Sequence, residues 1–80
     1  MHYVYILQSI DHPIQFYTGL CADVPARLKA HNAGQSPHTS KFKPWRLLSY
    51  HWFEEQETAA AFERYLKSGS GRAFALKRLR

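Results

Sequence analysis

The sequence predicts an α+β fold: a small three-stranded antiparallel sheet flanked by three helices, as a single domain over residues 1–80. The first reason is the order of the local patterns, which is strand, strand, helix, strand, helix, helix. The second is composition, because 45% of the residues are apolar and 15% are aromatic, which is typical of a globular core. The third is length, since 80 residues suit one domain with one modest core.

The first two strands are expected at residues 3–8 and 16–20. The first reads Tyr-Val-Tyr-Ile-Leu-Gln, a composition typical of a central strand that is buried on both faces. Turn-forming residues fill positions 9–15, so the two strands should form a hairpin. Gly19, near the end of the second strand, predicts a close approach of backbone or ligand there.

A short helix is expected at residues 24–32. Asp23 is a good N-cap, Pro25 suits the first turn, and Gly34 is a suitable stop. Within this helix Arg27 and His31 are four residues apart and therefore project from the same side.

The pair of Arg27 and His31, next to the strand that carries Tyr17, has two interpretations. An arginine and a histidine at this spacing can hold an anion such as a phosphate through charged hydrogen bonds. Alternatively, the pair is an ordinary solvated face of a surface helix.

The middle of the chain predicts a loop followed by a third strand. Residues 33–44 are rich in Gly, Ser and Pro, and their length fits a binding loop. The third strand is expected at residues 45–53, although its mixed apolar and polar pattern leaves open which face is buried.

Two helices are expected at the C-terminal end. The clearer one covers residues 57–67 and ends at Gly69. Its apolar stripe consists of Ala59, Phe62 and Leu66. Ser70 is expected to cap the last helix at residues 72–79. The residues that dock this last helix are expected to be Ala73, Leu76 and Leu79.

The net charge of +5 is concentrated in the second half of the chain. Residues 1–40 are neutral overall, residues 41–80 carry the whole excess, and no acidic residue follows Glu63. Clustered cations without compensating acids are the electrostatic signature of a nucleic-acid binder. The competing interpretation is a basic surface that only maintains solubility.

Other sequence features concern compartment and membrane. The single cysteine, Cys21, cannot form an internal disulfide, which suits a reducing cytosol. No apolar run approaches the ~20 residues that a membrane-spanning helix needs. We therefore expect a cytoplasmic protein without a membrane partner, and the sequence leaves its oligomeric state open.

Motifs along nearly the whole chain resemble one family. The triplets Tyr3-Val4-Tyr5 and Tyr17-Thr18-Gly19 resemble the GIY and YIG motifs of the GIY-YIG nuclease superfamily. Similarity to its small stand-alone bacterial (YhbQ-like) group is carried by HYVYIL, YTGL, RLKAHN, HTSKFKPW and FERYLKSGSGRA. The chain departs from the motifs at Tyr3, Val4 and Thr18, and it lacks the late asparagine of several active members.

The resemblance implies roles for individual residues. Family members hydrolyse phosphodiester bonds with one divalent metal ion, which implies Mg²⁺ or Mn²⁺ held by Glu63. It also implies that one motif tyrosine helps to activate the attacking water, that Arg27 stabilises charge on the phosphate, and that His31 relays a proton or binds a tyrosine. The implied catalytic residues are Tyr5, Tyr17, Arg27, His31 and Glu63. For Glu63 alone, a surface ion pair with Lys67 is the competing interpretation.

The candidate contacts to nucleic acid lie in the loop and at the basic C-terminal end. They are His38, Lys41, Lys43, Lys67, Arg72, Lys77, Arg78 and Arg80.

Three functions follow. The favoured one is a metal-dependent DNA endonuclease that prefers particular DNA structures and acts in repair, with RNA not excluded as a substrate. The second is a non-catalytic nucleic-acid-binding module. The third is a nuclease subunit that needs a protein partner, docked through aromatic residues such as Trp45 or Trp52.

Overall fold

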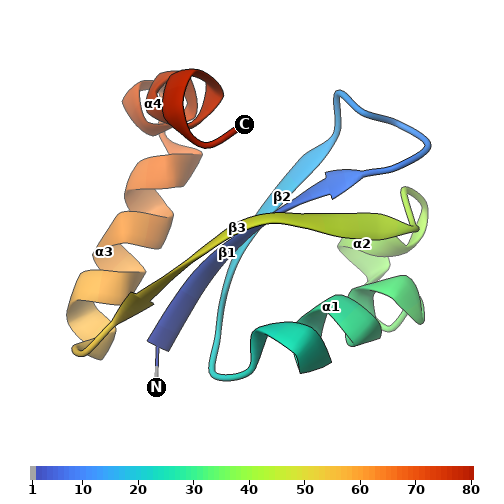
Figure 1. Ribbon diagram of the computed structural model, residues 1–80, viewed down its shortest axis with the longest axis horizontal. Coiled ribbons are helices and arrows are strands. Elements are labelled where there is room, and N and C mark those ends of the chain that lie inside the picture. The colour runs from blue at the N-terminus through green and yellow to red at the C-terminus, as the bar shows by residue number, and fades with distance from the viewer. Residues whose placement is uncertain (1) are drawn as a thin grey trace.

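In the computed structural model, which describes residues 2–80, a three-stranded antiparallel sheet separates two groups of helices (Figure 1). This confirms the expected α+β fold. The strands are β1 (His2–Ser9), β2 (Phe16–Cys21) and β3 (Trp45–Phe53). The helices are α1 (Val24–Asn32), α2 (Pro37–Ser40), α3 (Gln56–Lys67) and α4 (Gly69–Arg78). Within the predicted loop, α2 is an additional single turn. None of the helices in residues 2–80 has the length and hydropathy needed to cross a membrane.

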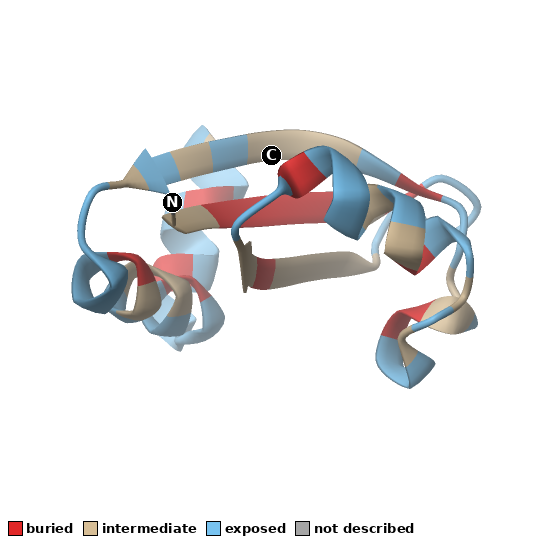
Figure 2. Cartoon of the chain, turned by 90° about the horizontal axis from the view of Figure 1, so that it is seen from below, coloured by how far each residue is buried: buried red, intermediate tan, exposed pale blue. Residues whose placement is uncertain are grey.

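The central strand is β1, because the sheet order is β2-β1-β3. Side chains of a strand alternate between the two faces of a sheet, and both faces of β1 are covered. Tyr5 and Leu7 pack in a core under α1, whereas Val4 and Ile6 pack in a second core under α3 and α4. Figure 2 shows this buried stretch between the helices. The prediction of a strand buried on both faces is therefore confirmed.

An irregularity in β3 explains its mixed pattern. Ile6 pairs with Ser49 and its neighbour Leu7 pairs with Leu47, so Leu48 is the extra residue of a β-bulge. The bulge changes which residues face each side halfway along the strand. No single alternation of apolar and polar residues can describe such a strand.

The predicted signals at both ends of α1 are confirmed. The Asp23 side chain accepts a hydrogen bond of 3.0 Å from the backbone N–H of Ala26, and Pro25 lies in the first turn. After the helix, Gly34 has a φ of +79°, a value that favours glycine over other residues. These local signals place Arg27 and His31 on a helix that lies against the sheet.

The junction of α3 and α4 differs from the prediction. Ser68, not Ser70, is the N-cap of α4, and its hydroxyl accepts from the N–H of Gly71 at 3.2 Å. The start of α4 packs so closely on α3 that a Cβ at Gly71 would lie 1.6 Å from the carbonyl oxygen of Tyr65. Gly69 therefore begins α4 and does not simply end α3.

The earlier start of α4 also changes which residues face the core. The buried positions are Gly71 and Ala75, followed by the partly buried Leu79. Leu76, which was expected to dock, is 67% exposed. Ala73, also expected to dock, is exposed. For α3 the predicted stripe is confirmed, because Ala59 and Leu66 are buried and Phe62 packs against them.

Candidate active site

Tyr5 lies at the centre of a polar cluster on the α1 side of the sheet. Its hydroxyl is 2.9 Å from Nε2 of His31, and the residue is only 1% exposed. Gly19, on the neighbouring strand, pairs with Tyr5 and leaves space for its phenol, since a Cβ there would lie 2.4 Å from the hydroxyl oxygen. A group does approach Gly19 closely, but it is the side chain of Tyr5 and not the backbone or ligand that was predicted.

His31 joins Tyr5 to the loop after α1. Its Nδ1 is 2.7 Å from the hydroxyl oxygen of Thr39, which is itself 3.5 Å from the carbonyl oxygen of Ser36. Burial, aided by the positive charge of Arg27, lowers the pKa of His31, so the imidazole is neutral near pH 7. A neutral imidazole has one donor and one acceptor nitrogen, so the two hydrogen bonds must run in opposite senses.

The direction of this chain follows from the protonation of Tyr5. Burial raises the pKa of Tyr5, and it outweighs the hydrogen bond from Arg27, which lowers it. Tyr5 therefore stays a protonated phenol that accepts from Arg27 and donates to Nε2 of His31. Nδ1 of His31 then donates to Thr39, and the Thr39 hydroxyl faces the Ser36 carbonyl. The polar cluster is a chain of donors that starts at Arg27.

Neither interpretation of the Arg27 and His31 pair, an anion-binding pair or a solvated helix face, holds for His31. Arg27 is exposed, but His31 is only 1% exposed, and both of its ring nitrogens are engaged. The two side chains do share one side of α1. The α2 turn, which contributes Thr39, covers the end of that side at His31. Only the guanidinium of Arg27 remains free to meet a phosphate.

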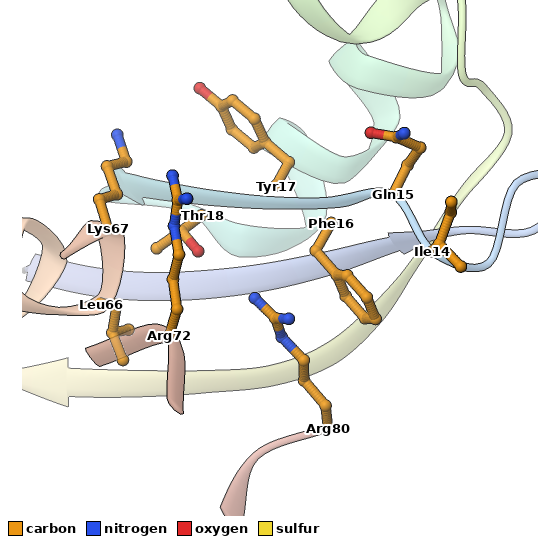
Figure 3. A pocket seen from close by; sticks show the side chains of 9 residues that line it. All are labelled: Ile14, Gln15, Phe16, Tyr17, Thr18, Leu66, Lys67, Arg72 and Arg80. Atoms are coloured by element: carbon orange, nitrogen blue, oxygen red, sulfur yellow. The ribbon is translucent and has the colours of Figure 1, made fainter. Parts of the chain in front are cut away.

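Tyr17 connects this cluster to a cleft on the outer edge of β2. Its ring centroid is 4.9 Å from that of His31 and 6.2 Å from that of Tyr5. Tyr17 also lines a cleft of about 460 Å³ (Figure 3). The other residues that line the cleft are Ile14, Gln15, Phe16, Thr18, Leu66, Lys67, Arg72 and Arg80. A substrate in this cleft would touch Tyr17 directly.

Glu63 lies on α3, which packs on the face of the sheet opposite to α1. Its carboxylate oxygen is 3.1 Å from Nζ of Lys67, so the predicted surface ion pair is formed. Lys67 lines the cleft together with Tyr17, which puts Glu63 next to a residue of the cleft but not in its lining. The structure thus joins Tyr5, Tyr17, Arg27 and His31 in one cluster and leaves Glu63 beside it.

Metal binding at Glu63 would depend on a single protein carboxylate. Among residues 2–80 no three His, Cys, Asp or Glu side chains are grouped so that they could hold a metal ion. Mg²⁺ commonly binds through one or two carboxylates while water and substrate phosphate oxygens complete its shell. A lone, partly exposed carboxylate beside a cleft that can admit a phosphate fits such an ion, provided that Lys67 gives up its contact.

The candidate contacts to nucleic acid fall into three places. Lys67, Arg72 and Arg80 line the cleft. Lys77 and Arg78 occupy the last turn of α4. His38, Lys41 and Lys43 lie in and after α2, on the opposite side of the sheet. These eight residues therefore do not form one continuous site.

The two tryptophans proposed as docking residues differ in exposure. Trp45, proposed as a docking residue, is 3% exposed, and its indole N–H donates to the carbonyl oxygen of Thr39 at 2.9 Å. Trp52, in contrast, is 53% exposed. Thr39 was not recognised as a site residue, because nothing in the sequence around it signals that its hydroxyl is buried. Asn32 was also missed, and it fastens α1 to Trp45 by two backbone hydrogen bonds of 2.5 and 3.1 Å.

Comparison with known proteins gives one consistent result. The sequence model described as "GIY-YIG catalytic domain" matches residues 1–77. A UPF0213 protein of Streptococcus pyogenes serotype M3 is 33% identical over 72 residues, which cover 89% of this chain and 76% of that protein. A UPF0213 protein of Haloquadratum walsbyi is 35% identical over 68 residues, which cover 84% and 74% respectively.

Two further matches come from a longer protein and from a solved structure. The structure-specific endonuclease subunit SLX1 of Scheffersomyces stipitis is 42% identical over 67 residues, covering 75% of this chain but 20% of that protein. The solution NMR structure of a UPF0213 protein from Bacillus halodurans superposes with a TM-score of 0.56 at 33% identity, covering 95% of this chain and 82% of that one.

Proposed function

Because this chain belongs to the GIY-YIG catalytic domain family, we propose that it is a metal-dependent nuclease that hydrolyses phosphodiester bonds in DNA. The observation that carries the proposal is the cluster of Tyr5, Tyr17, Arg27 and His31 at the edge of a cationic cleft. A cation and phenols next to a cleft that can admit a phosphate are the groups that phosphodiester hydrolysis needs for charge stabilisation and positioning.

In the proposed reaction Arg27 contacts the phosphate that is attacked. Its guanidinium is exposed, always charged, and able to bind two phosphate oxygens at once. The Tyr5 hydroxyl orients this guanidinium and is itself held by His31 and Thr39. Tyr5 and His31 thus act as positioning residues. Tyr17, whose ring lies at the cleft, is the residue best placed to hold the attacking water.

The proposed cofactor is Mg²⁺ or Mn²⁺ held by Glu63. When bound, such an ion polarises the phosphate and lowers the pKa of a bound water. Lys67 neutralises Glu63 in its absence, so the carboxylate does not repel an approaching phosphate. Phosphate entry would draw Lys67 away and free the carboxylate.

A preference for particular DNA structures, and action together with a partner subunit, remain parts of this proposal. They are supported by a relative whose name describes a structure-specific endonuclease subunit. The exposed aromatic residues Tyr50 and Trp52 on β3 supply a surface for such a partner. A role in DNA repair and a cytoplasmic location are likewise proposed on the basis of the family resemblance and the composition of the chain.

The test is cleavage of nicked, branched and linear DNA by the purified protein with Mn²⁺, Mg²⁺ or a chelator. We expect cutting with either metal and none with chelator. Glu63→Gln keeps the shape of the side chain and should reduce cutting at least about 100-fold, within the range of losses seen for essential electrostatic groups. Its melting temperature should change little, because an exposed i,i+4 ion pair contributes only ~0.3–0.5 kcal/mol.

The matched control is Glu57→Gln, which removes the same charge from an exposed position on the same helix. Cutting that survives in chelator, or equal activity of the two variants, would refute the metal role of Glu63. Salt-dependent DNA binding without cutting under any condition would favour the binding-module alternative. Cutting only after addition of a partner would favour the subunit alternative.

A further inference from the structure

The cleft on the outer edge of β2 has dimensions and chemistry that go beyond a general basic surface (Figure 3). It runs from the hairpin loop at Ile14 along Phe16 and Tyr17 to Lys67 and Arg72. Its volume of about 460 Å³ lies within the range of pockets that take small ligands. A single nucleotide fits such a space, whereas a double helix does not.

One end of the cleft is cationic without compensation. In residues 2–80, Lys67 is paired with Glu63, but neither Arg72 nor Arg80 has an acidic partner within ion-pair distance. Burial and the neighbouring charge of Arg72 both lower the pKa of Arg80, which means that the two guanidiniums repel each other. Two like charges held together favour the binding of an anion between them.

Phe16 and Ile14 form an apolar part of the cleft, next to Arg80. The guanidinium of Arg80 lies 4.0 Å from the centroid of the Phe16 ring, so a cation and an aromatic face form one surface. Ile14, beside it, is 86% exposed. Aromatic rings and arginine planes are the groups on which unpaired bases stack.

We propose that this cleft binds one unpaired nucleotide of a DNA strand, next to the phosphodiester that is cut. Its phosphate lies between Arg72 and Arg80, and its base packs against Phe16 and Ile14. In a duplex the base faces are covered by their neighbours, so only an unpaired nucleotide offers both a phosphate and a free base face. The position relative to the cut bond rests on the proposed function, because Tyr17 belongs both to the cleft and to the Tyr5 cluster.

The proposal explains why substrate structure should matter to such a small protein. A strand that leaves a duplex at a flap, branch or bulge presents an unpaired nucleotide directly beside paired DNA. The cleft then selects the junction by its geometry and not by base sequence, because stacking tolerates every base.

The test is binding in chelator, which prevents cutting, by fluorescence anisotropy. The probes are a labelled single-stranded oligonucleotide and a blunt duplex of the same length. The double variant Arg72→Gln/Arg80→Gln should flatten the slope of log K against log salt for single-strand binding by roughly 0.7, the value for one lost phosphate contact. The control Lys29→Gln/Arg64→Gln removes equal charge from exposed positions outside the cleft and should flatten it less.

Phe16→Leu tests the base-binding end of the cleft. It should weaken single-strand binding about fivefold or more, the lower range for loss of one stacked base, and leave duplex binding within about twofold. Ile14→Ala, at a position that is 86% exposed and therefore tolerant of change, should weaken the single strand in the same sense by a smaller factor.

Three results would overturn the proposal. The two double variants could show equal salt slopes, or Phe16→Leu could lose equal affinity for single strand and duplex. The third is a wild-type protein that binds the blunt duplex more tightly than the single strand. Cleavage of branched DNA in Mn²⁺ separates this failure from failure of the proposed function. If the wild type cuts DNA but the cleft variants bind single strands as the wild type does, the proposed nucleotide site is refuted and the nuclease function is kept. If the protein binds single strands through the cleft but never cuts DNA, the nuclease function is refuted and the nucleotide site is kept.

Discussion

Replacing Thr39 by valine tests whether the chain from Arg27 through Tyr5 and His31 is a working unit. Valine has nearly the same shape as threonine but lacks the hydroxyl that lies 2.7 Å from Nδ1 of His31. Because His31 is only 1% exposed, water cannot readily replace the lost partner. The variant therefore leaves a buried imidazole N–H without an acceptor.

The size of the effect follows from that burial. An unsatisfied buried donor costs about 1–3 kcal/mol. In a domain of 60–100 residues each 1 kcal/mol lowers the melting temperature by roughly 4–8 °C. We expect Thr39→Val to melt about 10 °C below the wild type.

Thr39→Ser is the matched variant, because it keeps the hydroxyl and removes one buried methyl group. Its cost should be about 0.8 kcal/mol, the value for one buried carbon. Circular dichroism melting of both variants measures stability, and ¹⁵N NMR of the His31 ring reports whether Nδ1 keeps its hydrogen bond. In cleavage assays Thr39→Ser should retain activity and Thr39→Val should lose part of it.

The reasoning fails if the serine variant is less stable than the valine variant, because the methyl group would then matter more than the hydrogen bond. It also fails if the ring nitrogen signals of His31 are the same in the valine variant and the wild type.

Three other predictions concern packing and pH. Gly19→Ala should displace the phenol of Tyr5, since the new Cβ would lie 2.4 Å from the Tyr5 hydroxyl oxygen. The variant should lose about 1–3 kcal/mol of stability and also lose cutting activity. Gly71→Ala should lower the free energy of unfolding in denaturant by at least about 3 kcal/mol, because its Cβ would lie 1.6 Å from a backbone oxygen. Gly69→Ala is the control and should be close to neutral, because its Cβ would meet no atom within 4 Å. Burial lowers the pKa of His31 and His51 below the ordinary 6.5, so the unfolded chain binds protons first on acidification. Stability should be full above about pH 6.5 and fall below it, and an unchanged melting temperature between about pH 7.5 and 5 would contradict this.

Much of the fold could be predicted because its signals are local. The apolar run of residues 3–8 predicts a central strand, since a strand that is apolar on both faces needs cover on both. Asp23, the N-cap, and Gly34, which follows the C-cap Ala33, mark the two ends of α1, because each acts on backbone groups within one turn.

Packing between elements decided the features that the sequence analysis missed. Ser68 caps α4 only because the helix turns back onto α3 at Gly71, and this shifted the buried positions of α4 by comparison with the prediction. The bulge at Leu48 depends on its pairing with β1, so it has no signal within its own strand.

By itself the sequence determined which chemical groups this protein has: two motif tyrosines, an arginine one helix later, the last of its glutamates at position 63, and a basic C-terminal half. Only the tertiary structure decided how they are used. It buried His31 against Thr39, left Arg27 exposed, and joined Phe16 to Arg80 across 64 positions of the chain. The physical reason is that periodicity and capping describe neighbours within one element, whereas a cleft or a buried hydrogen bond exists only where separate elements pack together.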